Sequence, residues 1–154
     1  MSGDRHARII IDEHGYEAVL LEHPRGGHAE IMLHGAHLTS CVTIDGTELI
    51  YMSKDAVWEN SAALRGGVPV CFPQFSDMGP CTKSHGFARN SKFELATGAE
   101  DPRHLNQGEC TCRLVLNSSA ATLAEYPFPF QLFMNFRLLP HGVQIDMEVH
   151  CRPV

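Results

Sequence analysis

Short apolar and β-branched runs, separated by turn-forming residues, recur along the chain and constrain its fold more than any other feature. The runs cover residues 7–11, 18–21, 29–33, 38–44, 48–51, 110–116, 131–139 and 143–149. Each has the length of a strand, and no segment of comparable length shows a helical period. The sequence therefore predicts an all-β protein with few or no helices.

Turn chemistry joins several of these runs into hairpins. Glycine-containing turns lie at residues 13–15, 25–27, 45–46 and 140–142. Asp45-Gly46 is the strongest hairpin signal, because a two-residue turn with positive φ favours Asp followed by Gly. Residues 144–149 alternate strictly between polar and apolar, which predicts one buried and one wet face. Consecutive hairpins of this kind predict an antiparallel β-sandwich.

Length and charge narrow the classes of protein that the chain can belong to. Its 154 residues predict a single domain over residues 1–154. Eighteen acidic against twelve basic residues give a formal charge of −6 with histidine neutral, which argues against a nucleic-acid partner. The first apolar run, 9–11, is too short for a signal peptide or a membrane span. We therefore expect a cytoplasmic location, reduced thiols and no membrane partner.

Two stretches interrupt the strand pattern. Residues 58–90 contain repeated Gly and Pro, yet their aromatic residues Phe72, Phe75 and Phe87 favour order. Long ordered loops in compact domains are commonly functional, so we expect a functional loop there. The second stretch, 98–108, is more polar and predicts a surface excursion.

The first of these stretches gathers residue types that could bind an anion or a sugar. Arg65 and Arg89 could recognise phosphate or paired hydroxyls, their glycine neighbours would allow a ligand close to the backbone, and His85 could hydrogen-bond a sugar hydroxyl. Spacing alone favours the alternative, in which the arginines are surface or fold-stapling residues and His85 is an ordinary loop histidine.

Two pairs of residues have spacings that suggest metal ligands. His34 and His37 are three residues apart, which a strand does not present to one side, so we expect structural roles. Cys110 and Cys112 would share a strand face, but zinc needs further converging ligands, so buried thiols are favoured. We expect no metal site and no cofactor.

Two motifs in the long loop carry a family resemblance. Residues 65–75 read Arg-Gly-Gly-Val-Pro-Val-Cys-Phe-Pro-Gln-Phe, and residues 85–90 read His-Gly-Phe-Ala-Arg-Asn. Together they resemble the glucose-6-phosphate 1-epimerase branch of the aldose 1-epimerase (galactose mutarotase-like) family, and the similarity extends to residues 29–31, 34–37 and 126–130. The resemblance implies the family's β-supersandwich, of which this chain would be a truncated N-terminal portion. It also implies an isomerase that interconverts α and β anomers of hexose 6-phosphates, chiefly D-glucose 6-phosphate, without a metal or organic cofactor.

The resemblance also implies roles for individual residues. By position, the phosphosugar-binding arginines of the family fall on Arg65 and Arg89, and its substrate-contacting motif histidine falls on His85. Ser84 stands where the family often has a substrate-contacting glutamine, and its hydroxyl has a shorter reach. The family's catalytic histidine and glutamate would fall beyond Val154, so no catalytic residue is assigned within the chain.

Two functions follow from these implications. The chain is a family enzyme that acts on hexose 6-phosphates, or it is a non-catalytic, truncated module that binds a sugar phosphate or a partner. A sandwich that stops at this point would leave sheet edges unpaired, which predicts self-association.

Overall fold

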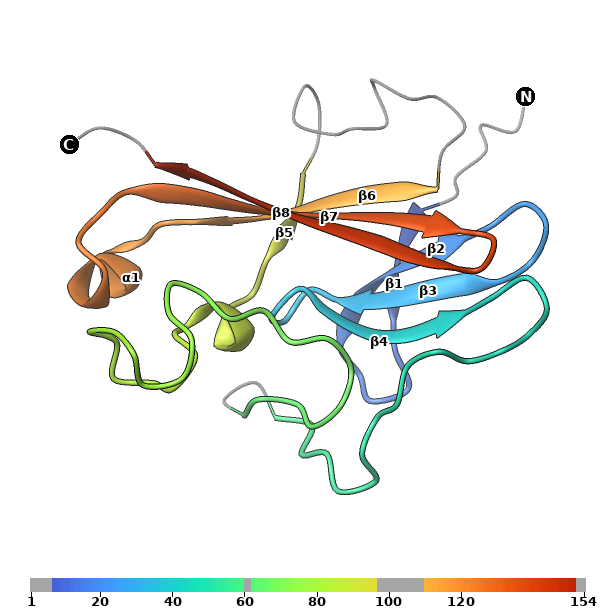
Figure 1. Ribbon diagram of the computed structural model, residues 1–154, viewed down its shortest axis with the longest axis horizontal. Helices are drawn as coiled ribbons and strands as arrows, with labels where there is room; N and C mark the ends of the chain where they lie inside the picture. The colour runs from blue at the N-terminus through green and yellow to red at the C-terminus, as the bar shows by residue number, and fades with distance from the viewer. Residues whose placement is uncertain (1–6, 60–61, 97–109, 152–154) are drawn as a thin grey trace.

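The computed structural model describes residues 7–59, 62–96 and 110–151, and it confirms the antiparallel β-sandwich (Figure 1). The first sheet consists, in order, of β1 (Ala7–Ile11), β2 (Glu17–Glu22), β3 (His28–Met32) and β4 (His37–Val42). The second consists, in order, of β5 (Glu94–Leu95), β6 (Thr111–Asn117), β7 (Phe130–Leu139) and β8 (Gly142–Cys151). All neighbouring strands are antiparallel. The predicted surface excursion at 98–108 lies outside the described residues.

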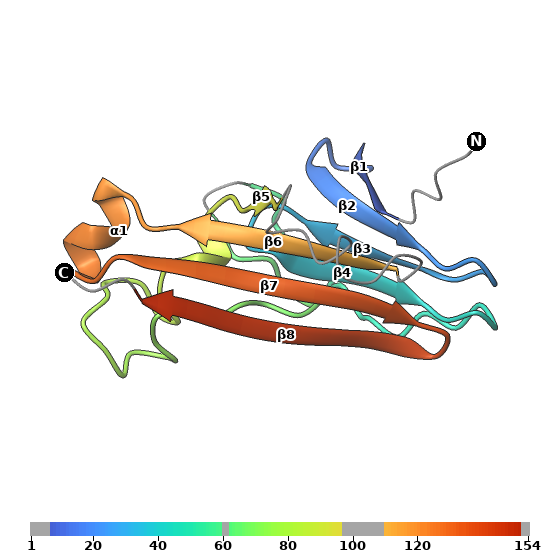
Figure 2. The ribbon, with the colours of Figure 1, turned by 90° about the horizontal axis from the view of Figure 1, so that it is seen from above.

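Apolar side chains from both sheets meet in one buried core, to which the segment between β4 and β5 also contributes. Leu21 and Ile31 of the first sheet and Leu132 and Phe136 of the second are almost inaccessible to solvent. Figure 2 shows β6, β7 and β8 as a twisted ribbon that lies alongside the first sheet. Since burying one such side chain contributes about 1.5–3 kcal/mol, this core is the main source of stability.

The turn at Asp45-Gly46 forms where the sequence predicts it, but it is longer than two residues. The amide of Thr43 donates to the carbonyl of Thr47 at 3.0 Å, and only the glycine of the pair has positive φ, at +86°. The Asp45 carboxylate accepts from the Thr43 hydroxyl and from the Thr47 amide. This side chain therefore stabilises a wider loop over residues 43–47, and β4 ends at Val42, before the turn.

The predicted strand at 48–51 is wrong. The Glu48 carboxylate accepts hydrogen bonds from the backbone amides of Cys41 at 2.9 Å and Ile50 at 2.8 Å. A side chain that accepts hydrogen bonds from backbone amides competes with the interstrand hydrogen bonds of a regular β-ladder. The segment is therefore joined to β4 only locally, by the Val42–Glu48 bridge and by the bond from the Leu49 amide to the Cys41 carbonyl.

Two short helical elements were not predicted from the sequence. One is the 3-10 helix η1 (Ala88–Asn90), and the other is α1 (Ala120–Glu125), which Figure 1 shows at one end of the second sheet. A capping box holds the start of α1, since the Ser119 hydroxyl accepts from the Thr122 amide and the Thr122 hydroxyl accepts from the Ser119 amide. Both elements are too short to show a helical period. Within the described residues, no helix has the length and apolar character needed to cross a membrane.

The strict alternation in β8 predicts one buried face, and the structure bears this out only in part. Val143 and Ile145 pack against the core, but Met147 and Val149 are 45% and 41% exposed. All four lie opposite buried β7 residues and so share the apolar face of the sheet. Among the described strands, β8 has a neighbour on one side only, and this leaves part of that face uncovered.

Candidate functional site

The two motif segments are joined directly through their backbones. The amides of Phe87 and Ala88 both donate to the carbonyl of Phe72, at 3.0 and 3.2 Å, beside a parallel bridge between Phe72 and Gly86. Gly86 has φ of +76°, and a Cβ at this position would lie 2.1 Å from the same carbonyl oxygen. Only glycine permits this approach, so the motif glycine sets the register between the two segments.

A buried glutamine holds the loop between the two motifs from inside. The Gln74 side chain is 8% exposed, and its amide nitrogen donates to the Ser76 carbonyl at 2.9 Å. Its amide oxygen accepts from the backbone amide of Cys81 at 2.8 Å. Sequence reasoning assigned no role to Gln74. A polar amide side chain within the apolar run Phe72–Phe75 could have indicated a buried hydrogen-bonding residue.

Three of the four predicted site residues lie together. The Arg89 Nη2 donates to the Ser84 carbonyl at 2.9 Å, and this bond ties η1 to the residue before His85. His85 is half-buried, and it exchanges two hydrogen bonds with the backbone of Ser76. The ring of Phe75 meets the imidazole edge-on, with centroids 4.9 Å apart. The backbone thus brings a guanidinium, a hydroxyl and an imidazole to one loop.

Arg65 lies on a second loop that a buried histidine supports. Its side chain is exposed, and among the described residues its guanidinium has no hydrogen-bond or ion-pair partner. The neighbouring carbonyl of Gly66 accepts from His37 Nε2 at 2.8 Å. Burial lowers the pKa of His37, because the charged form would lose its hydration, so the imidazole is held neutral as the donor to this carbonyl.

The turn between β3 and β4 contacts both loops. The Gly35 amide donates to the Ser91 carbonyl at 2.7 Å, and a Cβ on Gly35 would lie 2.7 Å from the Arg89 carbonyl oxygen. His37, which begins β4 beyond this turn, contacts the Arg65 loop. The bond from His37 to the Gly66 carbonyl agrees with the structural role predicted for this histidine. Arg65 and Arg89 are therefore carried by loops anchored to one turn, although no direct bond between Arg65 and the other predicted residues is found in the described part of the chain.

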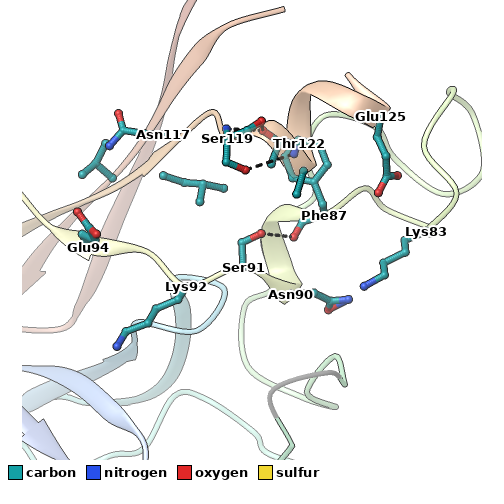
Figure 3. Close-up of a pocket in the computed structure, with 13 residues that line it drawn as sticks. Lys83, Phe87, Asn90, Ser91, Lys92, Glu94, Asn117, Ser119, Thr122 and Glu125 are labelled. Carbon is teal, nitrogen blue, oxygen red and sulfur yellow. Dashed lines mark hydrogen bonds between the residues drawn. The ribbon is translucent and has the colours of Figure 1, made fainter. Parts of the chain in front are cut away.

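A cavity of about 480 Å³ lies beside the second motif, between η1 and α1 (Figure 3). Figure 3 shows Lys83, Asn90 and Lys92 along one side and Ser119 and Thr122 along the other. None of the four predicted site residues lines it, although Lys83 and Asn90 immediately flank Ser84 and Arg89 in the sequence. The cavity therefore borders the second motif, but it is not lined by the residues predicted to bind the ligand.

Helix α1 supports this side of the motif loop. The carboxylate of Glu125 accepts from the amide and the hydroxyl of Thr82, at 3.1 and 3.2 Å. These bonds link the loop that leads to Ser84 with a helix 43 residues further along the chain. Sequence reasoning did not identify this contact.

Four of the six cysteines are buried, Cys71 is partly exposed and Cys151 is exposed. All six lie in described ranges and are free thiols. Cys110 and Cys112 are buried in the core, as the sequence predicts, and burial raises the pKa of Cys110 because the thiolate would lose its hydration. Among the described residues, no three His, Cys, Asp or Glu side chains converge on a position that could hold a metal ion.

Comparison with known proteins identifies the family. Residues 17–152 match the family described as Aldose 1-epimerase. The chain is 33% identical over 137 residues to a protein of Cenchrus ciliaris, and 33% identical over 148 residues to one of Escherichia coli K12, both named "Putative glucose-6-phosphate 1-epimerase". These alignments cover 88% and 94% of this chain but 41% and 46% of the relatives, so the chain spans about half the length of the curated relatives it matches. The chain belongs to the aldose 1-epimerase family.

Solved structures agree with this assignment. A "putative mutarotase" from Salmonella typhimurium is 30% identical, with a TM-score of 0.69 over 94% of this chain and 46% of that one. A galactose mutarotase-like protein from Clostridium acetobutylicum has a TM-score of 0.71 at 17% identity, over 94% of this chain and 48% of that one. The second similarity shows the fold alone. The sandwich is therefore of the galactose mutarotase-like type.

Proposed function

We propose that this chain carries the phosphosugar-binding part of a glucose-6-phosphate 1-epimerase, with D-glucose 6-phosphate as the expected hexose 6-phosphate ligand. Arg65, Ser84, His85 and Arg89 are the proposed contacts. The observation that carries the proposal is the bond from Arg89 to the Ser84 carbonyl, because it holds three of these residues on one loop. Family membership and the names of the relatives support the choice of ligand.

The two arginines suit a phosphate ligand in different ways. The Arg65 guanidinium is exposed and has no partner within the described residues, so it is available to an incoming dianion. The Arg89 guanidinium is half-buried and already oriented by Ser84, while its buried Nε has no hydrogen-bond partner in the described part of the chain. Charge-assisted bonds from arginine to phosphate are among the stronger hydrogen bonds in proteins. Arg65 would attract the phosphate, and the oriented Arg89 would add directional contacts.

Anomer interconversion requires two proton transfers. A base removes the proton from the C1 hydroxyl while an acid protonates the ring oxygen, so that the hexose opens, rotates about its C1–C2 bond and closes on the other face. The family gives these roles to a histidine and a glutamate that no motif in this sequence matches. The four residues are therefore proposed to bind and orient the sugar, and the reaction calls for no metal or organic cofactor.

Calorimetric titration of the purified chain with glucose 6-phosphate and with glucose tests the proposal. Arg65→Ala and Arg89→Ala should each weaken glucose 6-phosphate binding by about 1.5–3 kcal/mol, roughly 10- to 150-fold, and should weaken glucose binding less. Arg25→Ala, in an exposed turn between β2 and β3, is the matched control and should leave both affinities unchanged. Equal losses for the two ligands would show that neither arginine contacts the phosphate.

A second function, sugar-phosphate binding without turnover, is favoured by the share of the relatives that the chain covers. The chain matches less than half of each curated relative, and we propose that the acid–base pair belongs to the remainder. Each missing acid or base costs about 10²- to 10⁴-fold in rate. Fresh α-D-glucose 6-phosphate followed by NMR should therefore equilibrate no faster with the chain than without it. Rapid, saturable equilibration would contradict this account.

Self-association is proposed to occur through the edge of β8 that has no neighbouring strand among the described residues. This strand presents ten residues without proline or a bulge, and Met147 and Val149 expose its apolar face. A second copy could pair with this edge in antiparallel orientation. Val149→Lys should then shift the chain toward monomer in sedimentation, whereas a wild-type monomer would contradict the proposal.

The single-domain organisation over residues 1–154 and the cytoplasmic location stay predictions.

A further inference from the structure

His85 and Ser76 are held together by two backbone hydrogen bonds. The Ser76 amide donates to Nδ1 of His85 at 2.9 Å, and the His85 amide donates to the Ser76 carbonyl at 2.9 Å. A backbone N–H can only donate, so Nδ1 must present its lone pair. A neutral imidazole has one protonated nitrogen, which places the proton on Nε2.

We infer that the Ser76 backbone fixes His85 as the Nε2–H tautomer, so that the imidazole serves as a hydrogen-bond donor to ligand oxygen and not as a base. The identity of that ligand, a hexose 6-phosphate, rests on the proposed function, whereas the tautomer does not. The Nε2 atom has no partner among the described residues and is not among their buried unpartnered atoms. It is therefore accessible to a ligand.

The loop keeps this arrangement in spite of backbone strain. His85 has φ of +64° and Ser76 has φ of +52°, in the left-handed region that non-glycine residues rarely adopt. Such residues cost about 1–3 kcal/mol each and persist only where surrounding contacts hold them. The bond from Gln74 to the Ser76 carbonyl supplies one such contact, and the close packing of Gly86 on Phe72 supplies another.

The tautomer limits what His85 can do to a ligand. Its Nε2 already carries a proton, and Nδ1 cannot accept a proton from a ligand without losing the Ser76 bond. Arg89, bonded to the adjacent Ser84 carbonyl, is likewise a donor without an acceptor site. Two donors carried by one loop favour a ligand rich in acceptor oxygens, as a phosphosugar is. His85 is therefore a binding and orienting residue, and Ser76 is the residue that positions it.

The tautomer is measured directly by two-bond ¹⁵N–¹H correlation spectra of the histidine rings, recorded on the free chain at mildly alkaline pH, where an ordinary histidine is neutral. We expect the His85 pattern of protonated Nε2 and unprotonated Nδ1. Protonated Nδ1, or averaging between the two tautomers, would overturn the inference. With glucose 6-phosphate added, the Nε2 resonance should shift while the tautomer stays the same. If other site resonances shift and Nε2 does not, the donor role is overturned.

Two substitutions separate the donor from the loop contact. In His85→Asn the side-chain oxygen can replace Nδ1 and accept from Ser76, and asparagine tolerates positive φ, but nothing reaches the position of Nε2. In His85→Gln the amide nitrogen can reach that position, but the bond from Ser76 is lost. We expect the Asn variant to keep its melting temperature and bind glucose 6-phosphate about 10-fold more weakly, because a hydrogen bond to the ligand is lost.

The Gln variant should show the opposite pattern, with a lower melting temperature and binding within about threefold of wild type. Equal binding by the two variants, or tighter binding by the Asn variant, would overturn the donor role. If the wild-type chain does not bind glucose 6-phosphate at all, the proposed function fails, and the spectra of the free chain then decide this inference alone.

Discussion

The ribbon β6–β7–β8 and the motif segment 62–90 are both ordered, but different interactions hold them. The ribbon is a regular antiparallel ladder whose alternate residues, such as Leu132 and Phe136, enter the core. The motif segment has hardly any β-ladder. Instead, single side chains bond its backbone groups, among them Gln74 within the segment and His37 of β4. An apolar residue of similar size could replace most of the core-facing ribbon residues, whereas each polar contact in the motif segment depends on one residue type.

This difference in interactions assigns the two regions different roles: the ribbon chiefly stabilises the fold, and the motif segment chiefly shapes the candidate site. The ribbon buries apolar area, and such a core tolerates changes that conserve volume. Hydrogen bonds in the motif segment fix the directions of the His85 and Arg89 side chains, which no apolar contact could do. Substitutions in the ribbon should therefore unfold the chain as a whole, and substitutions in the motif segment should disturb the site more than the fold.

The largest effect is expected from Phe136→Ala in the ribbon. Phe136 is 1% exposed, and its removal leaves a cavity in the core, so the free energy of unfolding should fall by about 3–5 kcal/mol. Met147→Ala, on the partly uncovered face of β8, is the control and should cost less than about 1 kcal/mol. Urea unfolding followed by circular dichroism measures both. Similar losses would mean that β8 is covered in solution.

A smaller but more local effect is expected from Gly86→Ala. The added Cβ would meet the Phe72 carbonyl oxygen at 2.1 Å with φ at +76°, so we expect a loss of about 3 kcal/mol and displacement of His85. Gly142→Ala has open space at its Cβ and should change stability by less than about 1 kcal/mol. The β-sheet circular dichroism signal should survive in both variants, while the His85 resonances move only in the first. Unchanged His85 resonances would count against the register set by Gly86.

Gln74→Ala tests the polar contacts of the motif segment. It would leave the Ser76 carbonyl and the Cys81 amide without their partner, at a cost of about 1–3 kcal/mol. Gln144→Ala, an exposed change on β8, should cost less than about 0.5 kcal/mol. Hydrogen exchange should report faster opening of the loop that contains Cys81 only in the Gln74 variant. Equal exchange rates in the two variants would contradict the role of Gln74 in holding this loop.

The smallest effect is expected from pH. Burial lowers the pKa values of His34 and His37, so the unfolded chain takes up these protons first, and stability falls as the pH drops below about 6.5. His37→Gln should flatten this dependence in urea titrations between neutral and mildly acidic pH. The lowered pKa values of Asp45 and Glu48 act in a more acidic window, since their contribution is lost only as carboxylates protonate. A His37→Gln profile parallel to wild type would contradict the role assigned to His37.

Sequence reasoning succeeded where side-chain periodicity and turn chemistry agreed. The predicted run 7–11 matches β1 at both ends, and runs 131–139 and 143–149 match β7 and β8 to within a few residues. It failed where a side chain replaced a backbone partner, as Glu48 does beside β4. It also missed α1, whose six residues are held by the Ser119–Thr122 capping box and tertiary contacts rather than by an amphipathic pattern.

The site residues came from the family resemblance, because spacing alone favoured structural roles for them. The contacts that organise the site could not be derived in this way. The Gln74 side chain bonds the backbone of Cys81, seven positions away, and the Ser76 amide bonds the His85 imidazole, nine positions away. The close approach of Gly35 to Arg89 joins segments 54 residues apart. These contacts depend on loop geometry, which hydrophobic periodicity does not encode.

The central claim is that the motif segment forms a site that recognises the phosphate of a hexose 6-phosphate. Calorimetric titration of the wild-type chain with glucose 6-phosphate and with glucose, at matched pH and ionic strength, tests this most directly. The account predicts saturable binding of glucose 6-phosphate that is at least about 10-fold tighter than that of glucose, because charge-assisted contacts to the arginines are available only to the phosphate. Equal affinities for the two ligands, or no binding of glucose 6-phosphate, would contradict it.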